Sequence, residues 1–304
     1  MLPPERAGRS APSDTIATRS AITDAIRAGI WRTEPQPDER TIAGVRCLVH
    51  GARREARGTV LHLHGGAFRI GAPEQVGSFA AALAERCDVR VVCPAYRLAP
   101  EHPFPAALHD GRAILAALCA ESARAVLLSG DSAGGGLAAS LALTAKNDAV
   151  TLAGLALLSP WLDLRVSASA FDLNAATDPL FSTGAAMAAA ELYLQGHDPV
   201  DPLVSPLFGS PSAFPPTYVN VGSGEVLLED ARDFAARLTR GGIDCCLDVV
   251  PDMEHVAVTR DLTSLGAKYT FERLVLFVAK RMAASASTLA GRGEPPSQPS
   301  RPIS

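Results

Sequence analysis

The chain has 304 residues, of which 47% are hydrophobic, and a formal net charge of −4. This length suits one large α/β domain with a sizeable core, and the slight acidity gives no electrostatic footprint for nucleic acid. No apolar stretch approaches the roughly 20 residues of a membrane span, and the first residues lack the apolar core of a secretory signal. The six cysteines show no disulfide or metal-binding spacing, so we expect a cytoplasmic protein.

Apolar runs and helical stretches alternate along most of the chain. Residues 1–40 mix polar residues with a weak helical pattern, and we interpret them as a helical arm that contributes to a lid. Continuous apolar runs then predict buried parallel strands with helices between them, which favours an α/β architecture with right-handed crossovers. The expected strands are Val45–Val49, Val60–His64, Val89–Cys93, Ala125–Ser129, Leu155–Leu158, Tyr218–Val221 and Cys245–Val250. The expected helices are Gln75–Cys87, Pro105–Glu121, Ala133–Lys146, Glu229–Arg240 and Val256–Ala283.

Two segments depart from this alternation. Residues 161–216 contain many prolines and one helix candidate, Thr183–Gln195, so we interpret them as a lid inserted above the sheet. Residues 41–160 and 217–283 then form the α/β core. Residues 284–304 are small, polar and proline-rich, and we expect a disordered tail there, because such a segment cannot bury enough apolar surface to become ordered.

The sequence Gly130-Asp131-Ser132-Ala133-Gly134 matches the pattern G-x-S-x-G. An apolar run of strand length precedes it, and a small-residue helical stretch follows it. A sharp strand-to-helix turn with this pattern presents the serine hydroxyl at the top of a sheet, and the glycines permit close approach of the backbone. We therefore expect Ser132 to be a nucleophile.

A serine nucleophile requires a base within hydrogen-bonding distance. Where this motif is catalytic, the chain order is serine, acid, histidine, and only His197 and His255 follow Ser132. His197 lies in a Gly-His-Asp-Pro sequence that predicts a surface turn. His255 lies shortly after the last predicted strand, in a loop that faces the crevice where such sites form. We expect His255 to be the base.

The base needs a buried carboxylate to hold its tautomer, and this acid should follow the preceding strand. Glu225 is the first acidic residue after the glycine turn at residues 222–224 and is our choice. Asp230 and Glu229 stay open as alternatives. The dipole of a helix favours acidic residues in its first turn, so all three also have an ordinary structural explanation.

The loop after the predicted strand at residues 60–64 opens with two adjacent glycines, Gly65 and Gly66. Adjacent glycines let backbone N–H groups face a substrate oxygen, where they would stabilise developing negative charge. We expect the N–H groups of Gly65, Gly66 and Ala133, the residue after the nucleophile, to be these donors. His64 precedes the nucleophile in the chain and is expected to brace this loop.

Together these motifs resemble the hormone-sensitive-lipase-like (bacterial family IV) carboxylesterases of the α/β-hydrolase superfamily. The resemblance covers about residues 60–260 and rests on HGGAF (64–68), YRLAPEHPFPAA (96–107), GDSAGG (130–135), SPWLDL (159–164), GSGEVLLED (222–230) and the loop of His255. Three positions depart from the family's usual pattern. Ala67 replaces a third glycine, Ala95 replaces an aspartate, and Glu225 replaces an aspartate that is one methylene shorter.

The resemblance implies an α/β-hydrolase fold with a mostly parallel sheet, helices on both faces and a helical lid. It implies a serine carboxylesterase with Ser132, Glu225 and His255 as its triad and with no metal or organic cofactor. Lactone hydrolysis by the same residues is the alternative activity. A non-catalytic ligand receptor on the same fold is disfavoured by the presence of His255. The family also implies a homodimer formed through the sheet edge at Cys245–Val250.

Apolar residues near the Gly65 loop and in the lid region are candidates for the walls of the substrate pocket. Because only 5% of the chain is aromatic and no long apolar lid helix is evident, we expect small-molecule esters with short acyl chains or small rings. For each wall residue, ordinary packing inside the lid is the competing explanation. The candidates are Phe68, Leu180, Phe181, Tyr193, Leu207 and Phe208.

Overall fold

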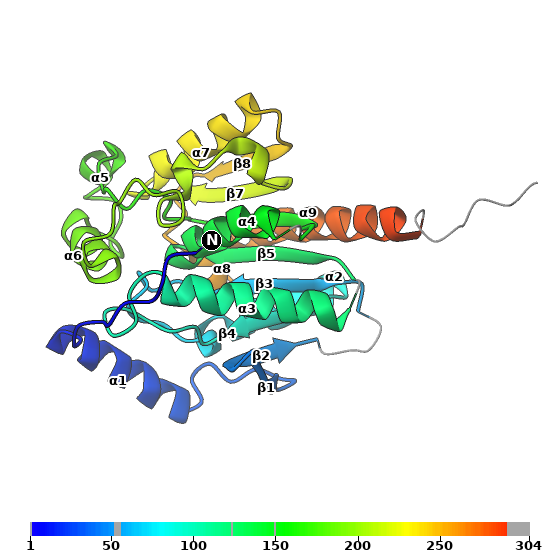
Figure 1. The fold of residues 1–304 in the computed structure, drawn as a ribbon, viewed down its shortest axis with the longest axis horizontal. Coiled ribbons are helices and arrows are strands. Elements are labelled where there is room, and N and C mark those ends of the chain that lie inside the picture. The colour runs from blue at the N-terminus through cyan, green and yellow to red at the C-terminus, as the bar shows by residue number, and fades with distance from the viewer. Residues whose placement is uncertain (1, 52–55, 123, 149, 291–304) are drawn as a thin grey trace, which may run out of the picture.

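The computed structural model describes residues 2–51, 56–122, 124–148 and 150–290 of the chain. One mixed β-sheet runs through the molecule (Figure 1). The sheet has eight strands in the order β1-β2-β4-β3-β5-β6-β7-β8. The β1–β2 and β2–β4 pairs are antiparallel, and the other pairs are parallel. The strands are β1 (Asp38–Ile42), β2 (Val45–His50), β3 (Thr59–Leu63), β4 (Arg90–Pro94), β5 (Val126–Asp131), β6 (Gly154–Leu158), β7 (Thr217–Gly222) and β8 (Cys245–Val250).

The central parallel strands are buried on both faces, as their apolar sequences predict. Every residue of β3, β5 and β6 is buried. Because these strands run in the same direction, their carboxyl ends meet at one edge of the sheet. The loops that leave β3, β5, β7 and β8 at this edge contain Gly65, Ser132, Glu225 and His255. The predicted mostly parallel α/β sheet is confirmed.

Helices cover both faces of the sheet, as expected (Figure 1). One face carries three helices whose apolar side chains belong to the larger buried cluster: α3 (Ala106–Glu121), α4 (Ala133–Asn147) and α7 (Leu228–Arg240). The other face carries three helices that pack into a second cluster: α2 (Gly77–Cys87), α8 (Ala257–Arg260) and α9 (Leu265–Ala290). A short 3-10 helix, η1 (Pro73–Val76), leads into α2.

The segment between β6 and β7 adds no strand to the sheet. Residues 161–216 form α5 (Ala170–Leu173), α6 (Thr183–Leu194) and the short 3-10 helices η2 (Pro206–Phe208) and η3 (Pro211–Ala213). Figure 1 shows α5 and α6 at the same end of the molecule as α1 (Ser13–Arg27). We propose that these segments form a lid, and we call residues 161–216 the lid segment.

Polar contacts attach α1 to the rest of the molecule. The Nε of Arg19 donates to the carbonyl oxygen of Arg69 at 2.8 Å, and its Nη1 pairs with Glu101 at 2.7 Å. A second ion pair joins Arg9, which precedes α1, to Glu191 of α6 at 3.7 Å. The N-terminal arm therefore contacts both the loop after β3 and the lid segment.

A short edge strand lies where we expected only the arm. β1 crosses the predicted boundary at residue 40 and pairs with β2 through a tight turn at Ala43 and Gly44. Its sequence, Asp-Glu-Arg-Thr-Ile, has four exposed residues and one half-buried residue, so it carries no apolar pattern. Charged side chains on an edge strand discourage pairing with other chains. Because these residues are charged or polar, the sequence shows no apolar pattern that would predict the strand.

The last predicted helix, Val256–Ala283, is divided into α8 and α9. The side chain of Asp261 accepts hydrogen bonds from the N–H and the hydroxyl of Thr263, each at 2.8 Å. Ser264 Oγ accepts the N–H of Ala267 at 3.3 Å and caps the start of α9. Such local side-chain bonds offer the backbone an alternative to helical bonds, which explains the interruption.

The C-terminal helix is also longer than predicted. α9 extends to Ala290, so residues 284–290, which we expected in the disordered tail, are helical. The remainder of the predicted tail, residues 291–304, lies outside the described residues. Over the part of the chain that the structure describes, no helix has the length and apolar character needed to cross a membrane.

Candidate active site

Ser132 occupies a sharp turn between β5 and α4. Its backbone angles, φ 51° and ψ −123°, are strained for a residue with a side chain. A Cβ on Gly130 would lie 2.2 Å from the carbonyl oxygen of Gly134, and a Cβ on Gly134 would lie 2.0 Å from that of Leu63. Only glycine therefore fits at these two positions. The geometry is that of a nucleophile elbow.

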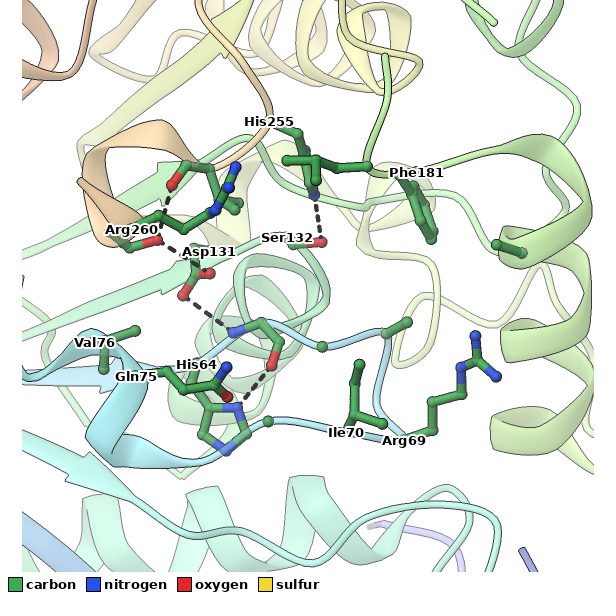
Figure 2. Close-up of a pocket in the computed structure, with 18 residues that line it drawn as sticks. His64, Arg69, Ile70, Gln75, Val76, Asp131, Ser132, Phe181, His255 and Arg260 are labelled. Atoms are coloured by element: carbon green, nitrogen blue, oxygen red, sulfur yellow. Dashed lines mark hydrogen bonds between the residues drawn. The ribbon is translucent and has the colours of Figure 1, made fainter. Parts of the chain in front are cut away.

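His255 reaches this serine from the loop between β8 and α8. Its Nε2 lies 3.0 Å from Ser132 Oγ, as Figure 2 shows. Phe181 from the lid segment packs parallel to the imidazole, with ring centroids 5.9 Å apart and an interplanar angle of 10°. Both His255 and Ser132 are only 6% exposed. The histidine is thus held in a fixed orientation beside the hydroxyl and shielded from water.

Glu225 lies on the other side of the imidazole. Its Oε2 is 2.7 Å from His255 Nδ1, while its Oε1 accepts the hydroxyl of Ser159 at 2.8 Å and the N–H of Gly222. A Cβ on Gly222 would lie 2.9 Å from Glu225 Oε1 and 1.9 Å from the carbonyl oxygen of Met253. The bare glycine therefore leaves the room that the longer glutamate side chain needs.

The alternative acids are engaged elsewhere. Asp230 Oδ2 accepts the N–H groups of Leu162 and Asp163, each at 3.0 Å. Burial, aided by the charge of Asp163, raises the pKa of Asp230 to about 7. Glu229 accepts the hydroxyl of Ser169 at 2.7 Å. Both side chains support the lid segment, and the structure brings only Glu225 among these three to His255.

The surroundings of His255 favour its protonated form. Burial lowers the pKa of the imidazole, but the hydrogen bond and charge of Glu225, with further charge from Asp178 and Asp131, outweigh burial and hold that pKa above its usual value. This environment would stabilise an imidazolium formed during a reaction.

Sequence reasoning missed Asp178, a buried carboxylate of the lid segment. Its Oδ1 accepts the N–H groups of Leu180 and Phe181, and its Oδ2 accepts the N–H of Val226, all at 3.1 Å. One side chain thus ties the residues beside His255 to the residue after Glu225. The Asp-Pro pair at 178 and 179 is a general turn signal, which was too weak to reveal this role.

The Gly65 loop differs in one respect from our expectation. The N–H of Gly65 donates to Asp131 Oδ1 at 3.1 Å, so it braces the loop and is not available to a substrate oxygen. Within the described residues, the protein provides no acceptor for the N–H groups of Gly66 and Ala133. Ala67 adopts a φ of 52° and lines the cavity beside them. The N–H group of Ala67 likewise has no acceptor in the described residues, so Gly66, Ala67 and Ala133 all keep a free donor near Ser132.

His64 and Asp131 hold this loop against the sheet. His64 Nδ1 lies 2.7 Å from the carbonyl oxygen of Gly65, and its ring stacks on Tyr96 at a centroid distance of 4.4 Å. Asp131 also contacts His62 Nε2 at 3.1 Å. The expected bracing role of His64 agrees with these contacts.

A cavity of about 260 Å³ opens beside Ser132. Of the predicted wall residues, Leu180 and Phe181 line it, whereas the other four do not. Phe68 stacks on Tyr193 in the core, with centroids 3.9 Å apart and an interplanar angle of 8°. The other two pack at η2, where Leu207 is buried and Phe208 lies under the guanidinium of Arg165 at 4.5 Å. The packing of Phe68, Tyr193, Leu207 and Phe208 away from this cavity agrees with the competing explanation, ordinary packing.

Several lining residues were not predicted. Some of them follow a predicted site residue within a few positions along the chain: Arg69 and Ile70 after the Gly65 loop, and Val256, Thr259 and Arg260 after His255. Ala185 is added by α6. In the described residues, we find no group of three or more histidine, cysteine or acidic side chains arranged to hold a metal ion.

Known proteins share this fold. A family model described as the α/β-hydrolase fold matches residues 60–259. The chain belongs to this family. An acetyl-hydrolase of Streptomyces hygroscopicus is 38% identical over 212 residues, which span 68% of this chain and 70% of that protein. An esterase of Acinetobacter venetianus is 36% identical over 66% of this chain and 68% of its own length.

Within the family, this hydrolase is a hormone-sensitive-lipase-like carboxylesterase. The crystal structure of an esterase from the bacterial hormone-sensitive lipase family superposes with a TM-score of 0.82 and 32% identity, covering 90% of this chain and 93% of the other. The predicted family, fold and enzyme class, a carboxylic ester hydrolase, are therefore confirmed.

Proposed function

We propose that this esterase is a serine carboxylesterase that cleaves small esters through an acyl-enzyme, with Ser132 as nucleophile, His255 as base and Glu225 as the orienting acid. One observation carries the proposal. A continuous hydrogen-bonded chain runs from Ser132 Oγ to His255 Nε2 (3.0 Å) and from His255 Nδ1 to Glu225 Oε2 (2.7 Å).

The reaction follows from this chain of contacts. Ser132 Oγ attacks the ester carbonyl carbon while its proton passes to His255 Nε2, and the Glu225 carboxylate stabilises the imidazolium that forms. The imidazolium then protonates the departing alkoxide as the C–O bond breaks, leaving an acyl group on Ser132. Water attacks this acyl group with His255 again as base, which releases the acid and restores the serine.

Negative charge develops on the carbonyl oxygen during both attacks. We assign its stabilisation to the backbone N–H groups of Gly66, which lines the cavity together with Ser132, and of Ala133, the residue after Ser132; neither has an acceptor inside the described protein. Gly65 supports them indirectly by fixing the loop through Asp131.

The size and lining of the cavity support small substrates. A volume of about 260 Å³ is below the range of typical drug-sized pockets. Leu180, Phe181 and Ile70 supply apolar walls. The relative named acetyl-hydrolase also favours a short acyl group. We therefore propose short-chain esters as substrates, with small lactones as the alternative within the same chemistry.

The test is hydrolysis of p-nitrophenyl esters from acetate to dodecanoate, together with a panel of small lactones. We expect the rate to peak at short acyl chains and to fall by roughly 10⁴-fold or more in Ser132→Ala. Asp230→Asn is the matched control, because it removes a buried carboxylate that does not contact His255. A lactone rate that exceeds every open-chain ester would favour the alternative. Equal rates for the wild type and Ser132→Ala would refute the triad and reopen the receptor interpretation.

We also propose a cytoplasmic location. All six cysteines are free thiols, including the buried Cys47, Cys87 and Cys93, and free thiols persist in a reducing compartment. Cell fractionation with an antibody to the protein tests this.

A further inference from the structure

Arg69 is a charged residue of the pocket wall that the proposed reaction does not use. It lines the cavity together with Ile70, Phe181 and Ala185. Figure 2 shows its guanidinium group on the same side of Ser132 as the Phe181 ring. The wall on this side of the nucleophile therefore combines apolar side chains with one cation.

The backbone holds Arg69 in place. Its N–H donates to the carbonyl oxygen of Gly66 at 3.1 Å, and its own carbonyl oxygen accepts Arg19 Nε at 2.8 Å. Its side chain is 19% exposed. A guanidinium on a fixed backbone in a mostly buried setting loses little conformational freedom when it binds a ligand.

Much of the hydrogen-bonding capacity of Arg69 is unused. Its Nη1 makes two long contacts, 3.4 Å to Thr15 Oγ1 and 3.7 Å to Asp14 Oδ2. The Asp14 side chain is 73% exposed, so this pair offsets little of the charge. The Nε of Arg69 is buried and has no hydrogen-bond partner among the described residues. A buried donor without a partner is rare in folded proteins and requires an explanation.

The other charged groups of the cavity do not supply that partner. The Asp131 carboxylate already accepts hydrogen bonds from Gly65 N–H and Thr259 Oγ1 and contacts His62 Nε2. Arg260 adds a second positive charge, which the exposed Glu254 faces at 3.4 Å. The cavity lining therefore carries two arginines and one engaged aspartate.

We propose that Arg69 binds an anionic group of the substrate, so that this esterase prefers small esters bearing a carboxylate over neutral esters of the same shape. The inference rests on the proposed function and names its substrate class. The Nε and Nη groups of arginine form a planar fork that matches the two oxygens of a carboxylate. Nη1 makes only the two long contacts described above, and within the described residues no acceptor contacts Nη2, so these two groups are the arms of the fork that a ligand in the cavity can meet.

The carboxylate could belong to the acyl part or to the alcohol part of the ester, and two isosteric pairs separate these sources. Monoethyl succinate and ethyl 4-oxopentanoate differ in charge on the acyl side. 4-Acetoxybenzoate and 4-acetoxybenzamide differ in charge on the alcohol side. The kcat/KM ratio within each pair is measured for the wild type, Arg69→Gln, Arg69→Lys and Arg260→Gln at two salt concentrations. Arg260→Gln is the matched control, since it removes the second cation of the same cavity.

We expect Arg69→Gln to lower kcat/KM at least tenfold for the anionic member of one pair and less than threefold for its neutral partner. Arg69→Lys should recover part of the preference, and added salt should weaken it in the wild type. The inference is overturned if Arg69→Gln lowers kcat/KM equally for the anionic and the neutral member of each pair. It is also overturned if the selective loss for the anionic ester occurs in Arg260→Gln and not in Arg69→Gln. If the wild type hydrolyses anionic and neutral esters with equal kcat/KM, this inference is refuted and the proposed function is not. No Ser132-dependent hydrolysis of any ester would instead refute the proposed function.

Discussion

Replacing Glu225 with glutamine tests the proposed triad most directly, because the hydrogen bonds around this side chain dictate how the amide must orient. Oε1 receives two donors, the Ser159 hydroxyl and the Gly222 N–H. The amide oxygen of Glu225→Gln should occupy that position, which directs its NH₂ group toward His255 Nδ1. A donor facing Nδ1 forces the ring proton onto Nε2, where it points at Ser132. The histidine is then in the wrong tautomer to accept the serine proton.

The expected loss of rate follows from that tautomer. In triads of this kind, the wrong tautomer with intact geometry lowers kcat by about 10⁴, which corresponds to roughly 5 kcal/mol of transition-state stabilisation. Glu225→Asp keeps the charge but shortens the reach by one methylene. A displacement of about 1 Å can cost on the order of 100-fold, so this variant should fall between the wild type and Glu225→Gln.

The assay is kcat for p-nitrophenyl acetate at pH 8, with thermal unfolding measured on each variant to confirm folding. Glu229→Gln and Asp230→Asn serve as controls, because they neutralise the neighbouring acids that contact the lid segment. If Glu225→Gln keeps more than a tenth of the wild-type kcat while Ser132→Ala is inactive, the assignment of Glu225 is wrong. A collapse of activity in Asp230→Asn with unchanged folding would point to Asp230.

Three further results are expected. The pKa of Asp230 rises from 3.8 to about 7 on folding, so its contribution to the free energy of unfolding is full below pH 3.8 and is lost as the pH rises to 7. Between pH 5 and 7, urea unfolding should therefore show the free energy of unfolding of the wild type falling by roughly 2–3 kcal/mol relative to that of Asp230→Asn. Parallel pH dependences of the two proteins would contradict this. Asp178→Asn removes a charge that raises the pKa of His255, so the acidic limb of kcat/KM should move to lower pH, and an unmoved limb would refute that coupling. Because β8 (Cys245–Val250) is an edge strand, we predict a homodimer through it; a clean monomer at micromolar concentration in light scattering would exclude this.

The elbow was predictable because its requirements are local. Gly130, Ser132 and Gly134 stand at fixed spacing between an apolar run and a small-residue helix. The structure explains the glycines by backbone contacts that leave no room for a Cβ. The position of His255 followed from chain order and from the place where the last parallel strand ends. These arguments need no knowledge of side-chain directions.

The choice among Glu225, Glu229 and Asp230 could not be made by pattern alone. All three precede or begin one helix, and helix dipoles favour acids at all such positions. The decision depends on tertiary contacts. Ser159, which follows β6, donates its hydroxyl to Glu225. The N–H groups of Leu162 and Asp163 donate to Asp230 instead.

The pocket walls illustrate a harder limit. Sequence analysis selected Phe68 as a wall residue because it is apolar and lies near the Gly65 loop, yet the cavity is lined by its neighbours Arg69 and Ile70. Ala67 and Phe68 adopt φ angles of 52° and 60°, which side-chain-bearing residues rarely do. This unusual turn directs the Phe68 ring into the core, where it stacks on Tyr193. Stacking in a dry core offsets the backbone strain, and the turn exposes the next two side chains to the cavity. Position in the loop identifies the segment, but the backbone conformation decides which side chain meets the substrate.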